Sequence, residues 1–305
     1  MKRVSVANGI LTAWKFGWPY SRHYLGTAVE PAGIPVLILG FILVLTVSAF
    51  PQRSRPTPTP RSDDPIRINS QIVNLLVDVT DHYDRSVTGL KKADFSISDN
   101  GVPQTINFFG DGDSPVSIGI VFDLSGSMTD SLPMARAALK NFLIRSHPQD
   151  EYFLLAFNKQ SRLILDHAVH GEEIVKQLER ANPSGNTSLY DAVYLGLDKV
   201  EHGVYRKKVL LIITDGQDNS SRYTIKDVIG AEKESGVIVY AIGITRGSFM
   251  RERRNSAYNL EDITKITGGQ AFFPYDETEV ATALDRVATE IRQLYVISYT
   301  PSPVA

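Results

Sequence analysis

A buried strand that stops abruptly in polar side chains dominates the organisation of this chain, at residues 117–128. The strand is a short apolar run rich in β-branched residues, which is typical of a strand covered on both faces. It ends in three oxygen-bearing side chains at alternate positions, Asp123, Ser125 and Ser127, with Gly126 inside the turn. Alternate residues of an extended backbone point the same way, so one carboxylate and two hydroxyls can converge on one point. Such a set suits a hard divalent cation; the alternative is a polar strand-to-helix turn in which a serine caps the helix.

Two later segments carry side chains of the same kind. Thr187 stands just before a helical pattern at 188–200, and Asp215 follows a second apolar strand at 209–214. The carboxyl ends of parallel strands lie along one edge of an α/β sheet, where ligands bind. The sequence therefore predicts that these two side chains meet the first cluster at that edge.

In this order, and on these strands and loops, the three segments resemble the metal-ion-dependent adhesion site of von Willebrand factor type A domains over about residues 115–273. The resemblance implies a Rossmann-like, doubly wound α/β fold and an exported bacterial protein of this family. It implies a metal site formed by Asp123, Ser125, Ser127, Thr187 and Asp215. The expected cofactor is Mg²⁺, with Mn²⁺ or Ca²⁺ as alternatives, and the expected partner is a protein whose Asp or Glu carboxylate completes the coordination of the cation.

Three further residues are expected to support this site. Gly126 and Gly216 allow the backbone to approach closely. Asp191 either orients the loop that carries Thr187 or is an exposed first-turn acid stabilised by the helix dipole. Thr187 and Asp215 each either bind the cation directly or contact it through a bound water.

The rest of the chain alternates strands and helices, which indicates a mostly parallel sheet covered on both faces. The apolar segment 163–165 follows the strand 152–157 too closely for a helical crossover, so we expect one antiparallel edge strand. The basic run 246–254 is expected to be a solvated loop, with a partner-docking loop as the alternative. The remaining expected elements are helices at 132–142, 172–181, 224–235, 259–267 and 277–292, and strands at 237–242 and 270–273.

Residues 65–112 predict a small β-rich domain with a hairpin turn at 99–101. Its large apolar side chains are few, so we expect a strand at 294–300 to complete it. The type A domain is then expected over 113–275, with a helix and a strand over 276–305. Because exported bacterial proteins of this kind commonly continue with further strands, the resemblance also implies a chain truncated at its C-terminus.

Residues 1–50 combine a basic region with an uncharged apolar run at 33–50, which is about long enough to cross a bilayer. This run predicts export, either as a membrane anchor or as a signal segment cleaved after Ala49. Basic side chains on its amino side predict that this end stays in the cytoplasm and the rest lies outside. The Pro-rich linker 51–64 is expected to be an extended spacer. The predicted location is therefore the cell envelope, the periplasm or the medium.

Composition removes several classes of function. The net charge of -2 provides no basic footprint for nucleic acid, so no nucleic-acid partner is expected. The absence of cysteine excludes disulfides, thiolate zinc sites and a cysteine nucleophile. The three motif segments contain no His or Lys base, so we expect no enzymatic activity. The resemblance implies metal-dependent protein binding, or adhesion. The alternatives are a metal-dependent hydrolase or phosphoryl-transfer enzyme, and a cation that only staples three loops together.

Overall fold

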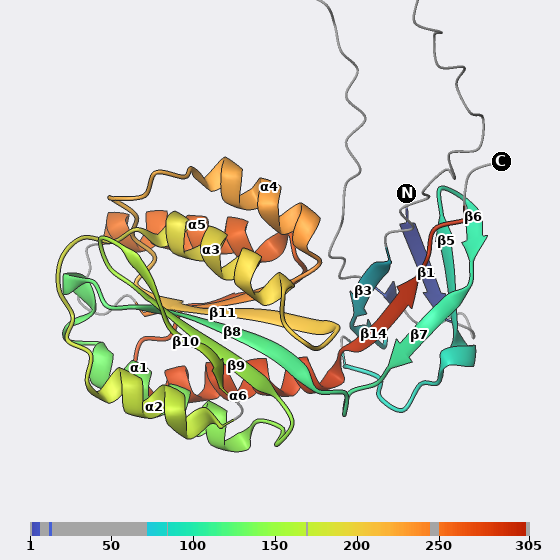
Figure 1. The fold of residues 1–305 in the computed structure, drawn as a ribbon, viewed down its shortest axis with the longest axis horizontal. Helices are drawn as coiled ribbons and strands as arrows, with labels where there is room; N and C mark the ends of the chain where they lie inside the picture. Colours follow the sequence, from blue (N-terminus) through green and yellow to red (C-terminus); the bar gives the residue numbers. More distant parts are fainter. Residues whose placement is uncertain are drawn as a thin grey trace, which may run out of the picture. The chain divides into compact units, whose positions relative to one another are not determined.

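A computed structural model of the chain is shown in Figure 1. It describes residues 2–6, 12–13, 72–83, 85–168, 170–244 and 250–302, and for 2–6, 12–13 and 250–256 only the backbone. All of these residues belong to one compact unit.

The central feature is a mixed sheet in which one strand alone runs against the others. The strand at one edge is antiparallel to its neighbour, and all other neighbouring strands are parallel. The sheet therefore confirms the predicted parallel architecture with one antiparallel edge strand. Its order is β10 (Ser161–Ala168), β9 (Glu151–Phe157), β8 (Val116–Asp123), β11 (Lys207–Thr214), β12 (Ile238–Gly243) and β13 (Ala271–Phe272).

Helices cover both faces of this sheet (Figure 1). Alternate residues of one strand enter opposite cores: Ile120 of β8 lies in the first core and Val121 in the second. Because both faces are covered, the strands read as continuous apolar runs in the sequence. One face is covered by α1 (Leu132–Arg145), α2 (Gly171–Glu179) and α6 (Glu277–Gln293), and the other by α3 (Leu189–Glu201), α4 (Ile225–Ser235) and α5 (Met250–Lys265).

Glycines leave no room for a side chain where α3 packs on the sheet and on the same face of β8. A Cβ atom added to Gly196 of α3 would lie 2.8 Å from Cγ2 of Val121. A Cβ atom added to Gly119 of β8 would lie 2.3 Å from the ring of Phe153. The close packing fixes α3 against β8 and so fixes the position of the loop that precedes α3.

A second, smaller sheet contains the last strand of the described chain at its centre. β14 (Tyr295–Tyr299) pairs antiparallel with β3 (Val73–Val77) on one side and with β7 (Ile106–Gly110) on the other. Tyr295 and Ile297 face the core of this small sheet, whereas Val296 belongs to the first core of the α/β sheet. The two sheets therefore share buried side chains across β14.

The predicted hairpin is confirmed. β5 (Phe95–Asp99) and β6 (Val102–Gln104) are antiparallel and are joined by Asn100 and Gly101. Both turn residues have positive φ, 50° and 83°, as the two-residue turn of this type requires. The short elements are β4 (Val79–Thr80), β2 (Thr12–Ala13), which pairs with β4, and the 3₁₀ turns η1 (Lys92–Asp94) and η2 (Gly126–Met128).

A buried lysine lies where the small sheet meets the α/β sheet. The Nζ of Lys207 donates to the carbonyl oxygens of Asp111 at 3.1 Å, Gly112 at 3.3 Å and Ile291 at 3.5 Å. Burial lowers the pKa of Lys207 to about 8. These contacts tie the segment that enters β8 to the end of α6, the helix that leads into β14.

The prediction of a loop at 246–254 is wrong for residues 250–254. Helix α5 begins at Met250, so residues 250–254 are helical, and the predicted helix at 259–267 is only the second part of α5. The first turns of α5 are almost entirely polar, so they carry no apolar periodicity from which a helix could be predicted. Residues 245–249 lie outside the described part of the chain.

The predicted membrane segment 33–50 and linker 51–64 also lie outside the described residues. Within the described ranges, no helix has both the length and the apolar character that crossing a membrane needs. One described contact conflicts with the predicted membrane topology. β1 (Lys2–Val6) pairs antiparallel with β5. A membrane-spanning segment at 33–50 would place these two strands on opposite sides of the membrane.

Glu232 provides a test of the packing of α4. Its side chain is 1% exposed, and neither carboxylate oxygen has a hydrogen-bond partner among the described residues. Burial raises its pKa to about 9, from a usual value of 4.5, so the folded state binds a proton that the unfolded state releases. We expect the free energy of unfolding to fall as pH rises from about 5 to 9, by up to about 1.4 kcal/mol per pH unit.

Replacing this carboxyl should remove that loss. Glu232→Met should be more stable than the wild type, by a margin that grows between pH 5 and 9, in urea unfolding followed by circular dichroism. Glu234→Met, on the exposed side of the same helix, is the matched control and should leave the pH dependence unchanged. A wild-type stability that is flat over this range would contradict the prediction.

Candidate functional site

Asp123, the last residue of β8, is a fully buried carboxylate at the carboxyl edge of the sheet. Its Oδ1 accepts a hydrogen bond of 2.8 Å from the backbone N–H of Ser125, and its Oδ2 accepts one of 2.6 Å from Oγ1 of Thr214. Thr214 is the last residue of the neighbouring strand β11. The parallel register of β8 and β11 therefore brings a hydroxyl donor to the carboxylate.

The two serines of the motif lie next to each other. The Oγ atoms of Ser125 and Ser127 are 3.0 Å apart, Ser125 is buried and Ser127 is exposed. The N–H of Gly126 between them donates to the carbonyl oxygen of Gly185 at 3.0 Å. A Cβ atom on Gly126 would lie 3.4 Å from that oxygen, at the near limit of ordinary contact, so space alone does not demand glycine here.

Thr187 is held in place by Asn219. The N–H of Thr187 donates to Oδ1 of Asn219 at 2.9 Å, and the N–H groups of Asn219 and Ser220 both donate to the carbonyl oxygen of Thr187 at 3.0 Å. Thr187 is 2% exposed. The loop that follows β11 and the loop that precedes α3 are thus joined on both sides of this one residue.

Asp215 is buried and stands directly after Thr214. Its Oδ1 accepts from the N–H of Gln217 at 3.1 Å. Gly216, with φ of 80°, adopts a left-handed conformation that favours glycine, and its N–H donates to Oγ1 of Thr214. The close turn keeps Asp215 at the sheet edge.

The electrostatics of Asp123 follow from this arrangement. Burial raises its pKa to about 7, the hydrogen bonds from Thr214 and Ser125 oppose that rise, and the charge of Asp215 adds to it. Two carboxyls therefore share a poorly solvated edge, and positive charge placed between them would offset the cost of keeping both ionised.

Asp191 orients a loop, but not directly the loop of Thr187. Its Oδ1 accepts from the N–H groups of Arg222 at 2.8 Å and Tyr223 at 2.9 Å. It stands in the first turn of α3, as expected for an acid at the amino end of a helix, but its side chain is only 15% exposed and it orders the loop that follows β11.

The donor set at this edge is two carboxylates and three hydroxyls, all hard oxygen ligands. Within the described ranges, no three His, Cys, Asp or Glu side chains are grouped so that they could hold a metal ion. A cation here would therefore depend on the hydroxyls of Ser125, Ser127 and Thr187 as well as on the acids. The residues present fit Mg²⁺ in type, because it accepts few carboxylates and retains waters.

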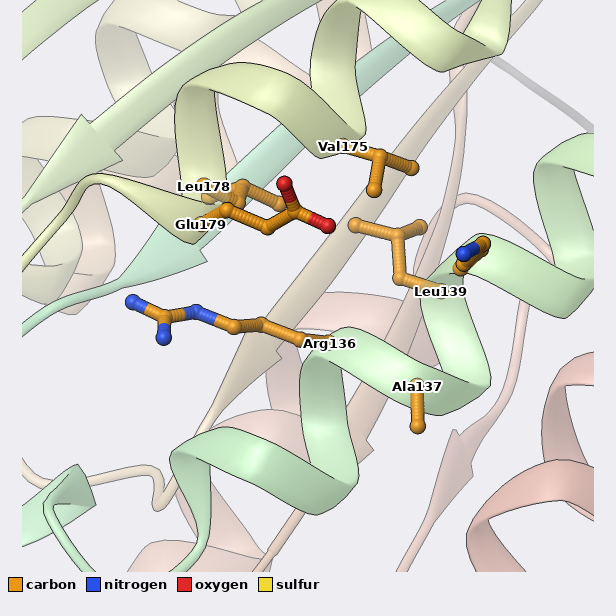
Figure 2. Close-up of a pocket in the computed structure, with 7 residues that line it drawn as sticks. Arg136, Ala137, Leu139, Val175, Leu178 and Glu179 are labelled. Carbon is orange, nitrogen blue, oxygen red and sulfur yellow. The ribbon is translucent and has the colours of Figure 1, made fainter.

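A cavity of about 130 Å³ lies elsewhere, between α1 and α2 (Figure 2). Arg136 and Glu179 stand on opposite sides of it, and aliphatic side chains such as Leu139 and Val175 form much of the rest of its wall. None of the predicted site residues lines it. It is a packing gap between two helices, and it contributes nothing to the candidate site.

Two residues of the site were missing from the sequence-based prediction. Thr214 was read only as part of a strand, although it donates to Asp123. Asn219 is not among the predicted site residues, although it bonds to Thr187 across 32 residues of sequence. The signal that could have found both is their position at or just after the carboxyl end of a predicted parallel strand.

The sequence of this chain is similar to those of known proteins. The sequence model of the family described as von Willebrand factor type A domain matches residues 117–286, more than half of the chain. The uncharacterized protein sll0103 of Synechocystis sp. is 26% identical over 109 residues, which cover 34% of this chain and 26% of that relative. The match thus spans about a quarter of the relative's length.

Solved structures give two further similarities. An aerotolerance-related membrane protein from Bacteroides fragilis has a TM-score of 0.49 and 17% identity, covering 58% of this chain and 99% of that one. A von Willebrand factor type A structure from Catenulispora acidiphila has a TM-score of 0.49 and 16% identity, covering 72% of this chain and 46% of that one.

The contact between Asn219 and Thr187 can be tested without any ligand. Asn219→Ala removes the acceptor of the Thr187 N–H, and a hydrogen bond of this kind contributes about 1 kcal/mol. We expect amide hydrogen exchange at Thr187, followed by NMR, to accelerate about fivefold. Asn219→Asp keeps an acceptor oxygen and should retain the protection. Equal exchange in the wild type and the alanine variant would show that the contact does not order the loop.

Proposed function

This chain belongs to the von Willebrand factor type A family, and from that premise we propose that it is a divalent-cation-dependent protein-binding module. The proposed cation site consists of Asp123, Ser125, Ser127, Thr187 and Asp215. The proposed partner is a protein that presents an Asp or Glu carboxylate at this site.

The observation that carries the proposal is the burial of Asp123 beside a second buried acid. A buried carboxyl is costly unless it is paired, and only two neutral donors bond to it among the described residues. The adjacent hydroxyls of Ser125 and Ser127 are the neutral oxygens that a hard cation accepts. Together these features support a binding site for a cation better than they support a simple polar turn.

The residues at and around the proposed site have different roles. Thr214 and Ser125 hold the carboxylate of Asp123, Asn219 holds Thr187, and the exposed Ser127 lies on the outer side of the site. When bound, Mg²⁺ would supply positive charge and a coordination position for the carboxylate of a partner. None of these residues is a His or Lys that could act as a general base, and the chemistry proposed is binding rather than turnover.

The direct test is a titration of Mg²⁺ and Mn²⁺ into the full chain by isothermal calorimetry. We expect saturable binding that Asp123→Ala and Thr187→Ala each weaken at least tenfold, because each removes an oxygen ligand. Asp130→Ala, an exposed acid a few residues downstream, is the matched control and should bind like the wild type.

Two results would change the proposal. No binding by the wild type at millimolar metal would contradict it. Binding that raises the melting temperature, while metal has no effect on capture of acidic peptides, would instead favour a cation that only staples the loops.

We also propose that the chain functions outside the cytoplasm, from the predicted export segment at 33–50. Cleavage after Ala49 would remove β1 and would resolve the conflict between export and the pairing of β1 with β5. We expect amino-terminal sequencing of the protein from its native host to begin at Phe50. A mature protein that retains residues 2–6 and fractionates with the cytoplasm would contradict this location.

A further inference from the structure

The loop that follows Asp215 extends beyond the candidate cation site and presents a second charged group. Residues 219–220 bond to Thr187, and residues 222–223 bond to Asp191 four positions later. The loop therefore runs from Thr187, just before α3, to Asp191 in the first turn of that helix.

Arg222 is the exposed cation of this loop. Its side chain is 88% exposed, and its Nε is 3.5 Å from Oδ2 of Asp191. One edge of the guanidinium thus faces Asp191, which leaves the planar fork of Nη groups available to a carboxylate. An exposed ion pair of this length contributes little to stability, so stability gives no strong reason for holding Arg222 there.

The residues next to Arg222 make specific contacts with α3 and within the loop. Tyr223 stacks on Tyr194 of α3, with ring centroids 4.1 Å apart and planes at 12°, and it remains 40% exposed. Asp218, the other acid of the loop, is engaged inward, since its Oδ1 accepts from Oγ of Ser221 at 2.5 Å and from the N–H of Tyr190 at 3.4 Å. Of these two charged side chains, Arg222 is therefore the one that faces solvent.

We propose that Arg222 binds a second carboxylate of the partner, so that this surface recognises an extended acidic peptide of the form acid-x-acid. The inference rests on the proposed cation site, which would take the first carboxylate. In an extended peptide, side chains two residues apart point the same way and are about 6.8 Å apart, so a carboxylate two residues from the one at the cation site would face the same surface. A bidentate contact between guanidinium and carboxylate would strengthen binding and would fix the position of the peptide on the surface.

The test uses the full chain with saturating Mg²⁺ and three fluorescein-labelled peptides, read by fluorescence anisotropy. The peptides are Gly-Asp-Ser-Asp-Gly, Gly-Asp-Ser-Asn-Gly and Gly-Asn-Ser-Asn-Gly. We expect the first to bind at least fivefold more tightly than the second, and the third not to bind. Arg222→Ala should bind the first peptide no better than the second, and Arg222→Lys should restore part of the difference.

Controls separate this inference from the proposed function. Mg²⁺ affinity, measured by calorimetry without peptide, should be equal in the wild type and Arg222→Ala. Arg145→Ala removes another exposed, ion-paired arginine, at the end of α1, and should keep the preference for the first peptide. Equal binding of the first two peptides by the wild type would overturn the role of Arg222 and leave the cation site standing. Failure of the wild type to bind Mg²⁺, or to bind any peptide despite bound Mg²⁺, would overturn both.

Discussion

Strand β8 is hydrogen-bonded along both edges and covered by helices on both faces, and this burial governs what happens at its carboxyl end. Asp123 ends the strand before the chain reaches solvent, so its charge lies in a poorly polarisable environment. A hydroxyl from β11 and a backbone N–H satisfy its oxygens, yet the pKa still rises to about 7. A carboxylate kept in such a place at a stability cost is more typical of a functional position than of a structural one.

Around this carboxylate the polar residues fall into an inner and an outer set. The inner set holds loops together: Asn219 bonds to the loop of Thr187, and Asp191 bonds to the loop of Arg222. The outer set, which includes Ser127 and Arg222, faces solvent. Rigid support behind exposed groups lowers the entropy lost when a partner binds, which suits a surface used for recognition.

At the amino ends of the same strands, two basic side chains hold the chain segments together. Lys207 donates to three carbonyl oxygens, and Arg292 bonds to both oxygens of the buried Asp150. These contacts join the start of β8 to the end of α6, which leads directly into β14. Because Val296 of β14 lies in the first core of the α/β sheet, the small sheet depends on the large one for part of its burial.

The sequence alone determined the periodic features. Continuous apolar runs predicted the parallel sheet, the short spacing before 163–165 predicted the antiparallel edge strand, and Asn100-Gly101 predicted a turn. Each of these follows from local chain geometry, which a few neighbouring residues fix. The polar start of α5 shows the limit of such patterns, because a helical segment without an apolar stripe leaves no periodic signal.

Only the tertiary structure decided which polar residues meet. The register between β8 and β11 sets Thr214 beside Asp123, and the packing of α3 on glycines brings Thr187 within reach of Asn219. The sequence places both residues near this edge but does not show which residues bond, since the contacts join segments tens of residues apart. The sequence specified the kinds of ligand at this edge, and three-dimensional packing specified which neighbours hold them, because side-chain contacts across strands depend on register and on how closely the helices can approach.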